Sequence, residues 1–119
     1  MCAALGDGHG GDAFFRYFTD NENAEAVERM ISGVPAGEMK PDQWQAQILA
    51  RVMRRARCIF VTEKENRETI EKMHMYWTSN LEDAIQMADS FAGAHASVTV
   101  IPDGVGVIVH KNKEECRPE

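Results

Sequence analysis

The residues of this chain best suited to chemistry lie near its start, in the glycine-rich segment 6–11. The segment reads Gly-Asp-Gly-His-Gly-Gly, and it stands between a short apolar stretch and a run of aromatic residues. Glycines spaced as Gly6-x-Gly8-x-x-Gly11 between a strand and a helix let backbone amides and a helix N-terminus approach a phosphate or a carboxylate. The segment predicts a loop that lines a ligand cleft or, alternatively, a tight turn that glycine permits.

A dinucleotide site requires more than this glycine spacing. Such sites have a second strand that ends in Asp or Glu about 20 residues after the glycines. Here residues 25–29 have a helical pattern, and the next clear strand begins only at Cys58. We therefore reject the dinucleotide interpretation and keep the two alternatives above.

His9 lies inside the glycine segment and is the histidine best placed to act on a ligand. It could carry a proton or donate to an anion, because imidazole titrates near neutral pH, or it could be a solvated or turn-bonding side chain. No second histidine stands at metal-ligand spacing from it, and His74, His95 and His110 are isolated. The sequence therefore contains no self-sufficient metal site and no visible catalytic triad.

A second group of polar side chains surrounds Trp44 at the start of a helix expected over residues 41–56. Gln43 and Gln47 share one face of that helix at spacing i, i+4. A buried indole N–H needs a partner, so Trp44 is either a core anchor or a donor in a pocket. Spacing alone favours the core, because apolar residues recur at i, i+4 and i+8 as one buried stripe. These are Trp44, Ile48 and Val52.

The rest of the chain alternates apolar strands with amphipathic helices. This order predicts a three-layer, Rossmann-like α/β domain around a mostly parallel sheet, with an antiparallel edge hairpin at the Asp103-Gly104 turn. We expect strands at 1–5, 58–62, 98–101 and 105–109, and a short extended piece at 75–78. We expect helices at 12–18, 24–32, 41–56, 62–74 and 79–92, with Asp12, Thr62 and Ser79 as N-caps and Gly93 as the stop of the last one. The domain is expected to end near residue 112, before a charged, disordered tail at 113–119.

Composition and charge exclude several classes of function. The 119 residues fit one domain, and the formal net charge of −6 argues against a nucleic-acid partner. No apolar run reaches the roughly 20 residues that cross a bilayer, so no membrane partner is expected. Three cysteines without CxxC spacing fit a reducing cytoplasmic location, with Cys58 in the core. One basic cluster is explained by cations that complement a helix C-terminus. It comprises Arg51, Arg54, Arg55 and Arg57.

Several phrases together resemble the C-terminal domain of the nickel-dependent lactate racemase family, over nearly the whole chain to about His110. The more specific phrases are PDQWQAQILAR at 41–51 and IPDG at 101–104. The glycine segment with the following FFRYF, the VT at 61–62, and the LEDA helix start at 81–84 add to the resemblance. We therefore expect the chain to be a piece of a longer protein.

The resemblance implies a two-domain racemase or epimerase, an isomerase that inverts a small 2-hydroxy acid. In that family a nickel pincer cofactor, derived from a pyridinium ring, accepts the C2 hydride while a histidine base takes the hydroxyl proton. The cofactor-bearing lysine, the nickel-binding histidine and the catalytic histidines belong to an N-terminal catalytic domain of the same polypeptide. The resemblance thus implies that this chain binds no cofactor by itself and is inactive alone.

The resemblance also implies which residues face the cleft. Trp44 matches the tryptophan that the family's C-terminal domain contributes there, which reverses the core interpretation. Gln43 and Gln47 are its neighbours. Gly8, His9 and Gly10 belong to the family pattern, and they either line the cleft or only determine the backbone shape. The alternative is a non-enzymatic α/β ligand-binding or regulatory module that uses the loop Gly6 to Gly11 for a nucleotide or an anion.

Overall fold

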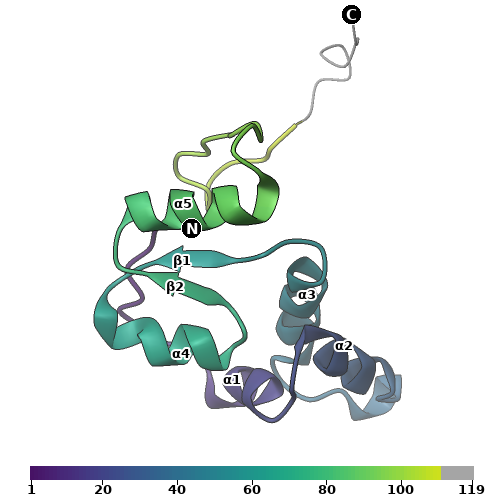
Figure 1. Cartoon of the computed structure of the whole chain (residues 1–119). Helices are drawn as coiled ribbons and strands as arrows, with labels where there is room; N and C mark the ends of the chain where they lie inside the picture. The colour runs from purple at the N-terminus through teal and green to yellow at the C-terminus, as the bar shows by residue number, and fades with distance from the viewer. Residues whose placement is uncertain (111–119) are drawn as a thin grey trace, which may run out of the picture.

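The sheet at the centre of this domain is small, and its strands run parallel. The computed structural model describes residues 1–110, and Figure 1 shows the two strands between the helices. Strand β1 (Ile59–Val61) pairs in parallel with β2 (Tyr76–Thr78), so that Ile59 lies opposite Tyr76. The predicted extended piece at 75–78 is therefore confirmed as a strand. The α/β class is confirmed, whereas this sheet is smaller than the Rossmann-like sheet that we predicted.

The apolar N-terminal segment lies along the other edge of β1. Cys2 forms a parallel bridge with Val61. The Val61 amide donates to the Met1 carbonyl at 2.8 Å, and the Ala3 amide donates to the Val61 carbonyl at 3.2 Å. The strand expected at 1–5 is thus reduced to a single bridge, but its parallel direction agrees with the prediction.

Helices cover the sheet and form a second group beside it. Figure 1 shows α5 on one side of the strands and α4 on the other, with α1, α2 and α3 together next to them. The helices are α1 (Asp12–Thr19), α2 (Ala24–Ser32), η1 (Ala36–Glu38), α3 (Gln43–Met53), η2 (Lys64–Asn66), α4 (Arg67–Lys72) and α5 (Leu81–Ala92). None of the helices in residues 1–110 is both long and apolar enough to cross a membrane.

The core lies where the helix group meets the sheet. Phe18 of α1 and Val27 of α2 are fully buried, and alanines of α3 close the gap between these helices. Small alanine side chains let helices approach closely, which explains why α2 and α3 pack along much of their lengths. The buried cluster comprises Phe18, Val27, Ile31, Ala46, Ala50, Ile70, Met73 and Met75.

Two helix boundaries match the prediction because local signals determine them. α2 occupies the expected range 24–32, and its N-cap Asn23 accepts a hydrogen bond from the Ala26 amide at 2.9 Å. α5 ends at Gly93, whose φ of 90° no residue with a Cβ adopts easily.

The N-caps predicted for α1, α4 and α5 are wrong. Gly11 precedes α1, so Asp12 is its first residue. The Thr62 hydroxyl donates to Glu63 at 2.7 Å and caps nothing, so the chain continues as η2 and only the short α4. Asn80, one residue after the expected Ser79, caps α5 by accepting from the Asp83 amide at 2.9 Å.

The buried stripe predicted for α3 is also wrong, because a different face of the helix is covered. Trp44, Ile48 and Val52 are 56%, 52% and 45% exposed. The face toward α1 and α2 instead carries Gln43, Ala46 and Ala50. Both faces have apolar residues at helical spacing, and the closer packing that alanine allows decides which one is buried.

The antiparallel hairpin is absent from the described residues. The chain turns at Asp103, whose carbonyl accepts from the Gly106 amide at 2.8 Å, but the flanking segments 98–101 and 105–109 form no strands. An isolated hairpin is marginal in water, and neither segment meets an open sheet edge here. The domain end at 112 and the tail at 113–119 lie outside the described residues and stay predictions.

Candidate functional site

The glycine segment forms a turn that holds two residues in the left-handed region. Gly8 has φ of 70° and Gly10 has φ of 92°, and a Cβ atom at either position would meet open space. The Gly8 amide donates to the Leu5 carbonyl at 3.0 Å. Backbone shape therefore explains Gly8 and Gly10, and one of the amides that could bind an anion is already used.

His9 projects from this turn with one ring nitrogen unsatisfied. Its ring stacks on Phe15 with centroids 4.4 Å apart, and its Nε2 lies 3.7 Å from Asp12 Oδ1. Its Nδ1 is buried and has no hydrogen-bond partner among the described residues. Buried ring nitrogens are normally paired, so His9 has bonding capacity that a ligand or a covering domain could use.

The glycine segment touches the start of α3 through Gly11 and Asp42. A Cβ atom at Gly11 would lie 3.3 Å from Asp42 Oδ2, closer than nine in ten real Cβ contacts. Glycine at this position lets the carboxylate sit against the backbone. The two segments that the sequence singled out are therefore neighbours in space, although thirty residues lie between Gly11 and Asp42 in the chain.

A tight turn before α3 determines how that helix begins. The Gln43 amide donates to the Lys40 carbonyl at 3.3 Å, and Asp42 has φ of 62° and ψ of −4°. These are the features of a type II turn with Pro41 at its second position, where glycine or asparagine usually occupies the third. Pro41 thus belongs to the turn, and the prediction that it opens the helix is wrong.

The Gln43 side chain closes this turn from inside the protein. Gln43 is 2% exposed, and its Oε1 accepts a hydrogen bond from the Lys40 amide at 3.1 Å. Together with the Gln43 amide it forms a reciprocal pair of bonds with Lys40. The structure therefore places Gln43 in the interior as the residue that holds the turn, while Gln47, one helical turn later, is half-buried.

Trp44 follows directly and points away from the core. It is 56% exposed, whereas the other tryptophan, Trp77, donates its indole N–H to the Thr62 carbonyl at 3.1 Å. This helix start combines a strained turn at Asp42, the buried Gln43 and the exposed Trp44. Such a combination is unusual for a helix whose only role is to pack in a core. Sequence reasoning missed Asp42, the residue that joins this turn to Gly11, since a proline before a helix more often marks its first turn.

Two surface hollows of the described residues are lined by residues other than the predicted site residues. A hollow of about 360 Å³ and another of about 400 Å³ lie near the C-terminal end of α3 and share Arg54. Their other lining residues include Cys58, His74 and Arg55. Gly10 and Trp44 are both exposed, and their place in a cleft stays a prediction.

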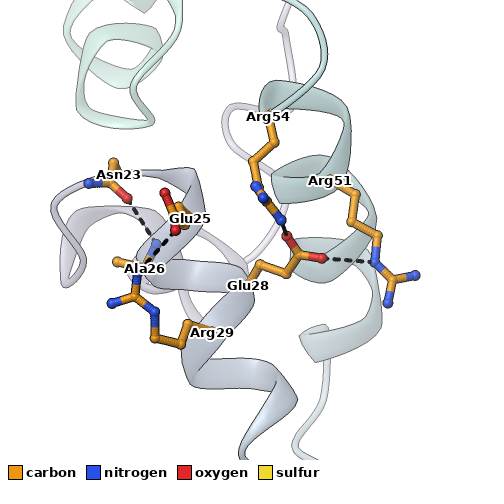
Figure 2. A network of polar contacts seen from close by, with 7 residues as sticks. All are labelled: Asn23, Glu25, Ala26, Glu28, Arg29, Arg51 and Arg54. Carbon is orange, nitrogen blue, oxygen red and sulfur yellow. Dashed lines mark hydrogen bonds and ion pairs between the residues drawn. The ribbon is translucent and has the colours of Figure 1, made fainter.

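Two arginines of the basic cluster near these hollows, Arg51 and Arg54, form structural ion pairs. Figure 2 shows Glu28 of α2 between two arginines of the α3 end, accepting from Arg54 and, at 3.4 Å, from Arg51. The hydrogen bond from Arg54 holds the pKa of the Glu28 carboxyl below its ordinary value of 4.5. These arginines therefore join α2 to α3, in addition to lying near a helix C-terminus as predicted.

Two other candidate groups have structural explanations. The His74 Nε2 lies 2.9 Å from the Phe18 carbonyl and 2.7 Å from the Asn21 carbonyl, so it ties the end of α1 to the turn before β2. Burial raises the pKa of the Cys58 thiol, which makes it a poor nucleophile. Residues 1–110 contain no group of three or more His, Cys, Asp or Glu side chains placed to hold a metal ion.

Known proteins share this sequence and architecture. Residues 1–109 match the family model of the lactate racemase C-terminal domain. The chain belongs to this family. It is 38% identical to the lactate racemases of Thermoanaerobacterium thermosaccharolyticum and Lactiplantibacillus plantarum, over 93% and 92% of this chain respectively. The solved lactate racemase apoprotein from the former matches 92% of the chain with a TM-score of 0.89 and 38% identity.

This lactate racemase C-terminal domain spans about a quarter of its relatives. The match covers 26% of each lactate racemase and 26% of the solved apoprotein chain. About three quarters of each relative's sequence therefore has no counterpart in this chain. The resemblance noted from the sequence is confirmed at the level of the family.

Proposed function

We propose that this chain forms one wall of the active-site cleft of a racemase or epimerase that inverts a small 2-hydroxy acid. The observation that carries the proposal is the exposed Trp44, presented by the turn that Gly11 and Asp42 join to the glycine segment. Membership of the lactate racemase C-terminal domain family supports the reaction type. The catalytic groups would come from the remaining domain of the same polypeptide.

The chain's own contribution would be positioning and exclusion of water. Trp44 offers a flat apolar wall and an indole N–H that can donate to a substrate or cofactor oxygen. Holding such a donor on a helix start, behind a closed turn, fixes its direction before the substrate arrives. The His9 Nδ1 and the half-buried Gln47 are further polar groups that a second wall could engage.

A nickel pincer cofactor is part of the proposal for the whole enzyme. When bound, it would take the C2 hydride of the substrate and return it to the opposite face. The described residues 1–110 do not fit a metal-holding role, because they bring no three ligand side chains together. We therefore propose no metal ligand and no cofactor-dependent step for the residues of this chain.

The alternative of an anion- or nucleotide-binding module has less support. The Gly8 amide is bonded to the Leu5 carbonyl, so the glycine segment has fewer free donors than its spacing suggests. One observation still favours it, namely that the His9 Nδ1 has no hydrogen-bond partner within residues 1–110. A thermal-shift panel of phosphate, carboxylates and nucleotides on the chain alone would reveal such binding.

The proposed function is tested by joining the chain to a known catalytic part. In this fusion the chain replaces the matching quarter of the Thermoanaerobacterium lactate racemase, and the enzyme is supplied with its cofactor. We expect the fusion to convert one lactate enantiomer into the racemic mixture, measured by chiral chromatography. The same relative without that quarter serves as the control. A folded, cofactor-loaded fusion that inverts neither lactate nor any larger 2-hydroxy acid would contradict the proposal.

A further inference from the structure

The hollow of about 360 Å³ lies where the helix group meets the amino ends of the two strands. Its wall joins residues of α2 and of the α3 end to residues just before or at the start of β1 and β2. Figure 1 shows the connection from α3 to β1 crossing from the helix group to the sheet. We call it the arginine hollow and define it by Arg54, Arg57, Cys58, His74 and Tyr76. Its volume is within the range of small-molecule sites, roughly 300–1,000 Å³.

The arginine hollow is separate from the candidate site at Trp44. Trp44 lies in the first turn of α3, whereas Arg54 directly follows the last residue of that helix. A helix of this length separates its two ends by roughly 15 Å. The residues of the described chain that line the hollow include none of the predicted site residues. A ligand in the hollow is therefore a second ligand, distinct from one that contacts Trp44.

The carboxylates near the hollow leave its charge positive. Glu25 belongs to the wall, but its Oε1 accepts a hydrogen bond from Arg29 at 3.2 Å. Arg54 pairs with Glu28, as Figure 2 shows. A guanidinium has five N–H donors, so one carboxylate partner leaves Arg54 with donors for a second acceptor.

Arg57 is the second guanidinium of the hollow, and no carboxylate within residues 1–110 pairs with it. Its Cζ lies 4.2 Å from the centre of the Phe91 ring, and the Tyr76 ring lies 4.9 Å from that same ring. A guanidinium stacked on a ring face keeps its N–H edge available and loses rotamer freedom in advance. The stack therefore prepares Arg57 for a bidentate acceptor such as a carboxylate or a phosphate.

The rest of the wall includes an apolar surface. Met53, Ala56 and Cys58 contribute to it, and Tyr76 adds a ring that is 40% exposed. An inorganic anion covers little of this surface, whereas an organic anion with an apolar body removes it from water.

We propose that the arginine hollow binds a small organic anion, whose carboxylate or phosphate group is held by Arg54 and Arg57 and whose apolar body lies against Met53 and Tyr76. Such a ligand contacts α2, the α3 end and the amino ends of the strands at once, so its binding stabilises the folded domain. The site does not depend on the proposed racemase function, because all the residues that form it belong to this chain.

A titration of the isotope-labelled 119-residue chain followed by NMR tests the proposal. The probes are phenyl phosphate, benzoate and inorganic phosphate, and benzamide is the neutral control. We expect phenyl phosphate or benzoate to bind saturably, with a Kd on the order of 1 mM, and to shift the amides of Arg57, Cys58 and Tyr76. Inorganic phosphate should bind about tenfold more weakly, because it lacks the apolar body. The tighter of the two organic probes identifies the preferred anionic group.

Substitutions in the basic cluster locate the binding. Arg57→Gln should weaken the tighter probe about tenfold, because a charge-assisted bidentate contact is lost. Arg55→Gln is the matched control, since it removes the same charge from a residue that lines the other hollow, and it should change the Kd by less than about twofold. Should Arg57→Gln not fold, Arg57→Lys keeps the charge without the planar fork and should weaken binding about threefold. The amides of α4 report that each variant is folded.

Three results would overturn the proposal. One is the absence of saturable binding for all three anions, and another is benzamide binding as tightly as benzoate. The third is equal weakening by Arg55→Gln and Arg57→Gln, which would indicate diffuse attraction to the basic cluster. Shifts confined to the Gly8 to Gly10 turn would likewise contradict it and assign the anion to the glycine segment.

Discussion

Gly11 lies against the carboxylate of Asp42, so that a Cβ atom at Gly11 would come within 3.3 Å of Asp42 Oδ2. This contact brings the glycine segment to the start of α3. Asp42 is also the residue with φ of 62° in the turn that precedes Trp44. The glycine segment, whose spacing suggests a phosphate loop, thus packs in this domain against the turn that precedes Trp44.

The glycine turn should depend on Gly8 far more than on Gly6. Gly8→Ala places a Cβ in the left-handed region and should destabilise the domain by about 1–2 kcal/mol. Gly6→Ala is the matched control, because Gly6 has no positive φ and open space at its Cβ position. Thermal unfolding of both variants measures the difference. Equal Tm values for the two variants would show that the left-handed turn is not needed for the fold.

The turn before α3 should depend on the Gln43 side chain. Gln43→Ala removes the acceptor of the Lys40 amide in the interior and should destabilise the domain by about 1–3 kcal/mol. Gln47→Ala changes a half-buried residue on the same helix face and should have a smaller effect. Urea unfolding gives both values. If Gln47→Ala were the more destabilising variant, the role assigned to Gln43 would be incorrect.

The sequence predicted those parts of the fold that local signals determine. The helix at 24–32, the stop at Gly93 and the extended piece at 75–78 follow from caps, glycines and apolar periodicity. The N-caps predicted for α1 and α5 are each wrong by one residue, because Asp12 and Ser79 compete with the neighbouring Gly11 and Asn80. Thr62 caps no helix, because η2 comes between it and α4.

Features that depend on contacts between residues far apart in the sequence could not be predicted from local signals. The stripe at Trp44 and the alanine face at Ala46 are both periodic, and only the packing of α2 decides which is buried. The hairpin at 98–109 has strand-forming residues, but within residues 1–110 it pairs with no strand. In the candidate site, Trp44 is exposed, but its place in a cleft, which the family resemblance implies, stays a prediction. The contact of Gly11 with Asp42 had no sequence signal.

The Glu28 pairing predicts a pH dependence of stability on the acid side. Its pKa is lowered by the Arg54 hydrogen bond, so the folded state favours the ionised carboxylate. The stabilisation is therefore present above the ordinary value of 4.5 and is lost as the pH falls through the lowered folded-state pKa.

Glu28→Gln tests this dependence against the parent chain. The variant should be less stable near neutral pH and equally stable in strong acid, and added salt should reduce the difference because the pair is partly solvated. Urea unfolding across the acid range measures it. A stability difference that does not change with pH would rule out the ion pair as its cause.

The claim that Trp44 faces the cleft is tested most directly by Trp44→Phe in the fusion with the Thermoanaerobacterium lactate racemase. The variant removes the indole N–H and keeps an aromatic ring, and Trp44 is exposed in the domain alone. We predict a fall in racemisation rate of about tenfold or more with an unchanged Tm, as expected for a lost donor in an active site. Trp77→Phe, which loses a structural hydrogen bond, should instead lower the Tm. Undiminished turnover in Trp44→Phe would contradict the account.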